Sequence, residues 1–217
     1  MKLLKSLGDL LYPPKCAFCG ELLPRGEKEI CPRCREKLPY HRSGEKKTDF
    51  IPLITAPLYY EEPVRTSLHR YKFSGRTVSA GGYATLMAEV TRRELEGRFD
   101  TLSWVPLHRK RRKERGYDQA GLLAEELGKR LGMEPVPLLV KLRNAPPQSG
   151  TGDKAARRAN ISGCYGLLPG AQVAGKRILL VDDILTTGAT LSECARVLKL
   201  NGAEEVYGAV TACSRGD

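Results

Sequence analysis

Two adjacent carboxylates, Asp182 and Asp183, follow the most apolar strand-like segment of the chain, residues 178–181. A turn of small and hydroxyl-bearing residues and a helix-like segment come directly after them. Ligands of open parallel sheets bind beyond the carboxyl ends of the strands, and backbone N–H groups at a helix start hold anions. The pattern suits a phosphorylated sugar. The acids would bind ribose hydroxyls, directly or through Mg²⁺, and the 5′-phosphate would lie on Thr186, Thr187, Gly188, Ala189 and Thr190. The structural alternative is that Asp183 caps a helix and Thr187 fills a turn.

Four of the seven cysteines form a second chemical pattern, two C-x2-C pairs separated by eleven residues: Cys16, Cys19, Cys31 and Cys34. Two such turns can aim four thiolates at one metal, the closed tetrahedral geometry of structural zinc. Gly20 follows the first pair, where such a turn often needs a positive φ. Two disulfides or two redox pairs are the alternatives. We favour zinc because the expected cytoplasmic compartment argues against disulfides, and two redox motifs in so short a span would be redundant. The other thiols, Cys164, Cys194 and Cys213, are expected to be buried and structural.

A dense run of cations occupies residues 109–115, between a strand-like and a helix-like segment. Residues 101–160 hold 13 basic and 6 acidic residues, which is most of the chain's net charge of +11. In a parallel α/β domain this run lies at the same sheet edge as Asp182, so its cations could hold a pyrophosphate group beside Mg²⁺. A nucleic-acid or partner surface and a plain solvated basic face are the alternatives.

Alternating strand and helix patterns must position these groups. Apolar and β-branched runs predict strands at residues 52–60, 101–106, 136–142, 177–181 and 205–211. Helical spacing predicts helices at residues 65–73, 82–95, 118–131 and 190–200, and residues 144–164 are expected to form a long mobile loop. The alternation predicts an α/β domain, with an open, mostly parallel sheet and helices on both faces, over residues 46–217. Residues 1–45 would form a short terminal helix, with leucines at 3, 4, 7, 10 and 11, and the four-cysteine module.

Composition limits the class of protein. The chain has 217 residues, 41% of them hydrophobic, which is enough to form a core. It contains no run of about 18 uncharged apolar residues, so we expect no integral membrane insertion. The leucine-rich start lacks the pattern of a signal peptide. A cytoplasmic protein, peripheral at most to the inner membrane, is therefore expected.

Four ordered motifs resemble those of a known family: the cysteine pattern, PLHRKRRKERGYDQ at residues 106–119, PPQSG and ARRAN between residues 146 and 160, and VDDILTTGAT at residues 181–190. The last string resembles the phosphoribosyl pyrophosphate (PRPP) signature of type I phosphoribosyltransferases. Together the motifs resemble the ComF family of competence proteins over nearly the whole chain. The resemblance implies a type I phosphoribosyltransferase fold with PRPP and Mg²⁺ as ligands. It also implies a role in DNA uptake during natural transformation, beside a helicase-like DNA translocator and a DNA-loading protein.

The resemblance carries over to individual positions in three loops. The first loop contributes Arg111, Arg115, Gly116 and Gln119, and the middle, mobile loop contributes Gln148, Arg157 and Asn160. The last contributes Asp182, Asp183, Thr186, Thr187, Gly188 and Thr190. Tyr117 and Asp118 stand where the family more usually has Phe-Asn, and the middle loop lacks the usual leucine near its start.

Three functions remain open at this stage. The first is an enzyme that displaces pyrophosphate from PRPP with a nitrogen nucleophile, with Asp182, Asp183 and Arg115 as the principal catalytic groups and Gln148 and Arg157 closing over the site. The second is a non-catalytic adaptor that binds single-stranded DNA or competence partners. The third is a PRPP-sensing regulator. One pyrophosphate needs only part of the basic run, which leaves four cations as candidate nucleic-acid contacts: Arg109, Lys110, Arg112 and Lys113.

Overall fold

A six-stranded, mixed sheet forms the centre of the computed structural model, which describes residues 13–41, 46–75, 77–143 and 159–215. Its path is β1-β2-β8-β7-β4, in which β2 (Ile51–Thr55), β8 (Glu205–Cys213), β7 (Arg177–Leu185) and β4 (Thr101–Trp104) run parallel. The edge strand β1 (Lys46–Thr48) is antiparallel to β2, and β3 (Leu58–Tyr59) pairs with the end of β8. The central strands are buried on both faces, as their continuous apolar runs predict.

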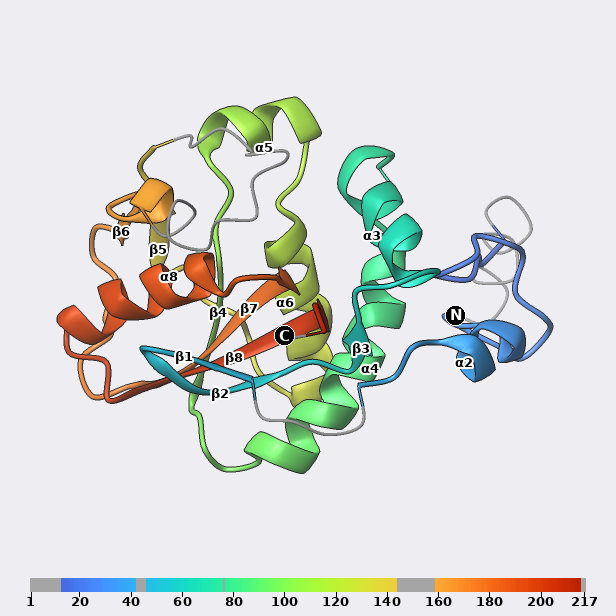
Figure 1. The fold of residues 1–217 in the computed structure, drawn as a ribbon, viewed down its shortest axis with the longest axis horizontal. Coiled ribbons are helices and arrows are strands. Elements are labelled where there is room, and N and C mark those ends of the chain that lie inside the picture. Colours follow the sequence, from blue (N-terminus) through green and yellow to red (C-terminus); the bar gives the residue numbers. More distant parts are fainter. Residues whose placement is uncertain (1–12, 42–45, 76, 144–158, 216–217) are drawn as a thin grey trace, which may run out of the picture.

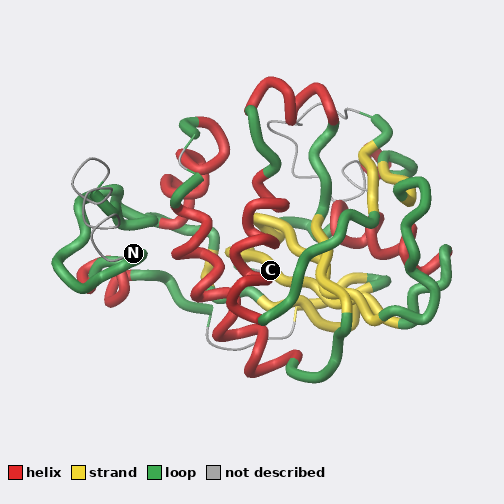
Figure 2. The backbone as a smooth tube through the Cα atoms, turned by 180° about the vertical axis from the view of Figure 1, so that it is seen from behind, coloured by secondary structure: helices red, strands yellow, loops and turns green. Residues whose placement is uncertain are grey.

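Helices cover both faces of this sheet (Figures 1 and 2). Leu179 and Val181 of β7 pack on the side of α4 (Ser79–Leu95) and α6 (Gln119–Leu131). Ile178 and Leu180 pack on the opposite side, with α8 (Ala189–Leu200). The alternation follows from the two-residue period of a strand. A separate antiparallel pair, β5 (Leu139–Lys141) and β6 (Tyr165–Leu167), lies beside α8. The predicted α/β class, with helices on both faces, is confirmed.

The cysteine-rich segment packs against α4 and α3 (Val64–Phe73). Phe18 is fully buried and meets the ring of Tyr83 edge-on, with centroids 5.4 Å apart. The carbonyl oxygen of Ala17 accepts hydrogen bonds from Ser67 Oγ at 2.7 Å and from Ser79 Oγ at 3.3 Å. A Cβ at Gly82 would lie 2.6 Å from Cβ of Ala17, so only glycine allows this approach. The segment therefore shares one core with the two helices, while the predicted domain boundary at residues 45 and 46 stays a prediction.

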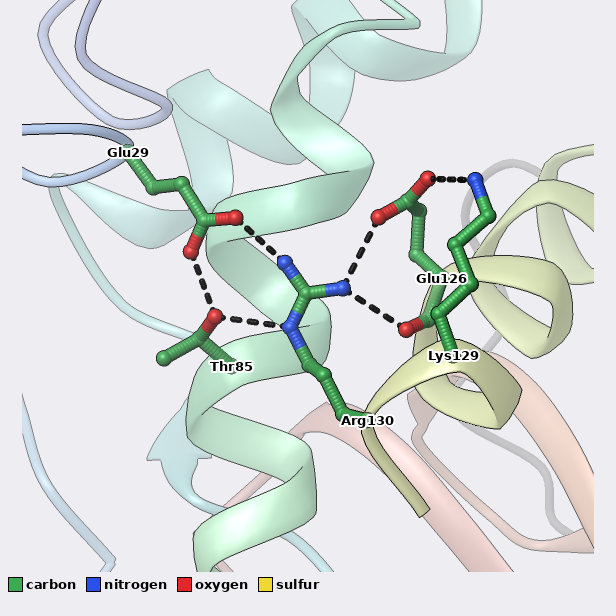
Figure 3. Close-up of polar contacts among 5 residues, drawn as sticks. All are labelled: Glu29, Thr85, Glu126, Lys129 and Arg130. Carbon is green, nitrogen blue, oxygen red and sulfur yellow. Dashed lines mark hydrogen bonds and ion pairs between the residues drawn. The ribbon is translucent and has the colours of Figure 1, made fainter. Parts of the chain in front are cut away.

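A polar network fixes the same segment from its other side (Figure 3). Arg130 of α6 binds Glu29 of the cysteine-rich segment, and its Nε donates to Thr85 Oγ1 of α4 at 2.9 Å. Its Nη1 also donates to Glu126 Oε2 at 2.8 Å. Thr85 donates to Glu29 as well, so three elements meet at one guanidinium.

Three of the predicted segments differ in the structure, which also contains three short elements that the sequence did not predict: α2 (Pro32–Lys37), β1 and β6. The strand expected at residues 52–60 is split into β2 and β3 at Ala56 and Pro57, because proline lacks the N–H that a ladder needs. The basic run expected to be a loop forms the helix α5 (Arg109–Arg115). The strand expected to end at residue 181 continues as β7 through both aspartates to Leu185, since β8 pairs with it up to Cys213.

The other predicted helices and strands are present, with ends that move by a few residues. Asp118 caps α6 by accepting from the N–H of Gly121 at 3.2 Å, and Gly132 ends that helix with a φ of 73°. No helix among the described residues has the length and apolar character to cross a membrane. The leucines at 3–11 and most of the loop expected at residues 144–164 lie outside the described residues.

Candidate active site

A cavity of about 590 Å³ opens at the carboxyl end of β7. Four parts of the chain line it: the β7–α8 turn, α3, the stretch from β4 to α6, and the β5–β6 pair. It contains six of the residues predicted to bind PRPP: Arg111, Arg115, Asp182, Asp183, Thr186 and Thr190. A larger groove of about 860 Å³ beside the cysteine-rich segment contains none of these groups. The described residues thus bring the carboxylates, hydroxyls and guanidinium groups of two distant motifs to one place.

The short helix α5 sorts its cations by side. Arg111 and Arg115 are four residues apart, so they share one face, and both are partly buried in the cavity wall. The remaining cations of the run are exposed and lie outside the cavity lining: Arg109, Lys110, Arg112 and Lys113. One face of α5 therefore faces the cavity, where a small anion could bind, and the other face is exposed and could bind a second partner.

The turn between β7 and α8 has the geometry expected of an anion-binding loop. Gly188 is the N-cap residue of α8 with a φ of 75°, and a Cβ there would lie 2.7 Å from Cγ2 of Thr48. Ala189 begins the helix, and its N–H lies 3.5 Å from Oγ1 of Thr187. Because Gly188 has no side chain to cap α8, the N–H groups that follow Ala189 in the first turn stay available to a ligand. The alternative of Asp183 as a helix cap is wrong, since Asp183 belongs to β7.

The two carboxylates lie in different electrostatic surroundings. Asp183 Oδ2 forms an ion pair with Lys72 Nζ of α3 at 2.8 Å. Asp182 Oδ1 accepts a hydrogen bond from the N–H of Asp183 at 2.8 Å. Burial and repulsion by Asp183 raise the pKa of Asp182 to about 7. For Lys72, burial acts against the charged form, but attraction by Asp183 outweighs it and raises the pKa. In the free site, therefore, the carboxyl group of Asp182 has a pKa near neutral pH, and the carboxylate of Asp183 is already paired with Lys72.

The cavity has a wall that sequence reasoning missed. It consists of His69, Lys72 and Phe73 on α3 and of Lys141 and Tyr165 on the β5–β6 pair. Burial and the nearby Arg111 lower the pKa of Lys141, whose Nζ lies 4.9 Å from the centre of the Tyr165 ring. Gln119, matched by the family resemblance, is also in the lining, and its Nε2 is buried without a hydrogen-bond partner. The one local indication was that residues 69, 72 and 73 share a face of the helix predicted at residues 65–73.

The remaining predicted residues are placed less centrally. Gly116 ends α5 with a φ of 81°, which directs the chain from α5 toward α6. Asn160 is exposed and is not among the residues that line the cavity. Gln148 and Arg157 lie outside the described residues, so their closing over the site stays a prediction.

The four predicted zinc ligands form one cluster. Their sulfur atoms all lie within 4.8 Å of one another, and the N–H of Cys31 lies 3.4 Å from Sγ of Cys16. Gly20 has a φ of 80°, as the turn requires. Four thiols at this spacing fit a tetrahedral zinc ion and leave no ligand position for catalysis. The site is therefore a structural zinc site. The other cysteines, Cys164, Cys194 and Cys213, are buried as expected.

The raised pKa of Asp182 predicts a pH-dependent gain in stability for the variant Asp182→Asn in metal-free buffer. Between pH 4 and 7 the carboxyl ionises in the unfolded chain before it ionises in the folded protein, so the wild type loses stability as the pH rises. The variant is expected to exceed the wild-type free energy of unfolding by about 1–3 kcal/mol at pH 8, and by less at pH 5. Urea unfolding at both pH values measures the difference.

Asp100 provides the matched control, because its pKa is shifted in the opposite direction. Burial acts to raise that pKa, but hydrogen bonds from Thr101 and Arg177 outweigh it and lower the value. Asp100→Asn should therefore reduce stability at pH 8 and have less effect in acid. An Asp182→Asn advantage that is equal at pH 5 and pH 8 would contradict the assigned repulsion.

Comparisons with known proteins show which domains and chains this protein is similar to. Residues 114–217 match the phosphoribosyl transferase domain, and residues 7–45 match the double zinc ribbon domain. The chain is 30% identical over 201 residues to the DNA utilization protein YhgH of Escherichia coli O157:H7, covering 88% of this chain and 86% of that protein. It is 27% identical to the competence protein ComFC of Bacillus subtilis, covering 89% and 82%. A solved glutamine PRPP amidotransferase from B. subtilis aligns with 65% of this chain and 30% of its own, at 20% identity and a TM-score of 0.43.

Proposed function

The chain belongs to the ComF family of competence proteins, and we propose that its phosphoribosyltransferase domain binds PRPP and transfers the phosphoribosyl group to a nitrogen nucleophile. One observation carries the proposal. Two carboxylates, two arginines and a helix N-terminus with hydroxyl groups surround a single cavity. Each of these groups complements one part of PRPP: the ribose hydroxyls, the pyrophosphate and the 5′-phosphate.

The proposed reaction assigns a role to each group. The 5′-phosphate lies on the β7–α8 turn at Thr186 and Thr190, and the ribose hydroxyls donate to Asp182 and Asp183. Arg111 and Arg115 hold the pyrophosphate. The nitrogen lone pair forms a bond to C1 of ribose while the C1–O bond breaks, and pyrophosphate leaves with the electron pair. The proton of the nucleophile passes to water. The arginines stabilise the charge that develops on the leaving group.

The donor set also fits Mg²⁺. Carboxylate oxygens are the protein ligands that this ion prefers, and it is usually shared with substrate phosphates. Asp182 and Asp183 would hold the ion, which would supply positive charge next to the pyrophosphate. Because Lys72 already binds Asp183, the lysine has to shift or share that carboxylate when PRPP and metal enter.

Calorimetric titration with fragments of PRPP tests the proposed orientation. PRPP, ribose 5-phosphate and pyrophosphate are each expected to bind in the presence of Mg²⁺. Arg111→Met should weaken pyrophosphate binding about 10- to 150-fold and ribose 5-phosphate binding little, since a charged hydrogen bond contributes about 1.5–3 kcal/mol. Thr186→Ala should weaken the binding of ribose 5-phosphate and change the binding of pyrophosphate little. Absence of PRPP binding, or equal effects of both variants on both fragments, would contradict the proposal. PRPP binding without pyrophosphate release with any acceptor would favour a PRPP-sensing regulator.

The outer face of α5 supports a second candidate function, an adaptor that binds single-stranded DNA. Four cations are exposed there and make no part of the cavity lining: Arg109, Lys110, Arg112 and Lys113. Relatives are named for DNA utilization and competence, which supports a DNA context. As an adaptor, the protein would act with helicase-like and DNA-loading partners, in the cytoplasm or at the inner membrane surface.

Salt dependence tests this second candidate. Replacing the four exposed cations by glutamine should weaken an oligonucleotide and flatten the slope of log K against log salt, because fewer counterions are released. PRPP binding should persist in that variant. An unchanged slope would exclude this face of α5 as the DNA contact.

A further inference from the structure

An aromatic surface on α3 borders the proposed reaction centre. Phe73 and His69 lie one helical turn apart, with ring centroids 4.8 Å apart and ring planes 44° apart. Both line the cavity that holds Asp182 and Asp183. Phe73 is 60% exposed, so much of an apolar ring faces solvent inside a site otherwise rich in charge. A large apolar side chain exposed in a cavity is typical of a ligand contact.

A guanidinium connects this surface to the predicted pyrophosphate site. The Cζ atom of Arg115 lies 4.7 Å from the centre of the Phe73 ring. Figure 1 shows that α3 and α5 rise beside each other at the same end of the sheet. Arg115, which we propose to hold the leaving pyrophosphate, therefore also contacts the aromatic surface. A ring that lies on the part of Phe73 left exposed by Arg115 would therefore lie next to the proposed pyrophosphate site.

We propose that Phe73 and His69 bind the phosphoribosyl acceptor and that this acceptor is a planar nitrogen heterocycle of the nucleobase class. The inference rests on the proposed transfer from PRPP and specifies its second substrate. Stacking on an aromatic ring suits any nucleobase, because each has a π-face of similar size. A ring nitrogen forms the bond to C1 and its proton passes to water, while pyrophosphate leaves with the electrons of the C1–O bond.

The chemistry of a simple amine argues against it as the acceptor. Four cations line the cavity, Lys72, Lys141, Arg111 and Arg115, together with three carboxyl groups, Asp118, Asp182 and Asp183. Near neutral pH an alkylamine or ammonia is mostly protonated and has no lone pair to attack C1, and its free base would leave the face of Phe73 unused. A nucleobase is neutral and covers that face. The same cations attract the phosphates of PRPP, so the two substrates are recognised by different properties of one cavity.

Two variants of Phe73 separate a stacking contact from a structural one. Phe73→Leu keeps an apolar side chain and removes the π-face, whereas Phe73→Trp keeps the π-face and adds a fluorophore, with Trp104 as the only other tryptophan. Because Phe73 is largely exposed, both variants should fold. Leu200→Ala, an exposed apolar residue at the far end of α8, is the matched control.

The experiment uses the full-length zinc-loaded protein with PRPP, Mg²⁺ and a panel of adenine, guanine, hypoxanthine, cytosine and uracil, with ammonium and a single-stranded oligonucleotide as further arms. At least one base should support pyrophosphate release and quench the Phe73→Trp fluorescence. Phe73→Leu should raise KM for that base about 10- to 100-fold and leave KM for PRPP within about twofold of the wild-type value. Phe73→Trp should have a KM for the base close to that of the wild type.

Each other outcome overturns one of the two proposals. A Phe73→Leu variant with unchanged KM for the base, ammonium as the sole acceptor, or quenching by the oligonucleotide alone would overturn the acceptor assignment. Absence of both pyrophosphate release and quenching by every base would overturn it as well. If PRPP fails to bind the wild type while a base still quenches Phe73→Trp, the transferase proposal fails and the ring-binding surface stands.

Discussion

Replacing Asp182 and Asp183 together by asparagine is expected to weaken PRPP binding more than about 100-fold while the fold is kept. Each carboxylate accepts from ribose hydroxyls or holds Mg²⁺, and a hydrogen bond to a charged group contributes about 1.5–3 kcal/mol, so two such losses exceed about 3 kcal/mol. The amide groups keep the size of the side chains. Lys72 loses its ionic partner at Asp183 but can still donate to the amide oxygen. Calorimetry with PRPP and Mg²⁺ measures the loss.

The same variant discriminates between the two candidate functions. Oligonucleotide binding should be unchanged, because the exposed cations of α5 are not altered. In a naturally transformable host, loss of DNA uptake with DNA binding intact would assign the biological role to the PRPP site. Uptake that persists in the variant would instead favour the adaptor. A melting temperature within a few degrees of the wild type is the control for folding.

Local motifs account for what could be predicted from the sequence. Asp182 to Thr190, Arg111 with Arg115, and the four cysteines each lie within short segments whose residue types suit one ligand group. Alternation of strands and helices then placed two of these segments at one sheet edge. The structure adds that Arg111 and Arg115 reach the cavity because α5 is helical, which the sequence did not indicate. Like charges along a helix repel one another, so a run of cations does not favour a helix.

Two caps and the helix dipole explain why α5 forms. The ring of His108 accepts from the N–H of Lys110 at 3.3 Å, and Gly116 ends the helix in the left-handed region. Arg112, Lys113 and Arg115 lie in the last turn, where cations interact favourably with the dipole. The contribution of α3 could not be predicted, because Lys72 and Asp183 are 111 positions apart, one on an amphipathic helix and the other near the end of a buried strand. The packing of α3 against the cysteine-rich segment, α4 and the start of α6 brings them together.

Removing zinc is expected to weaken PRPP binding, although none of the four cysteines lines the cavity. Backbone oxygens of the zinc segment hold α3: Ser67 Oγ donates to Ala17 and Arg70 donates to Phe18 and Cys19. The same helix carries Lys72 to Asp183. A zinc segment of this size folds around its metal, so chelation releases the support of α3. We expect a fall in melting temperature of roughly 10 °C or more, from a loss of several kcal/mol, and about tenfold weaker PRPP binding.

A variant that keeps the zinc but loses hydrogen bonds between α3 and the cysteine-rich segment tests whether zinc acts on PRPP binding through α3. Arg70→Met removes the donor to the two zinc-segment carbonyls and leaves the cysteines unchanged. It should retain one zinc per chain by metal analysis and still lose PRPP affinity, whereas Arg65→Met, an exposed arginine of the same helix, should lose neither. Metal-free protein with wild-type PRPP affinity would show that α3 stands without the zinc segment. If both losses occur as expected, the cysteine-rich segment stabilises the wall of the candidate active site through α3, and this role does not require contact with DNA.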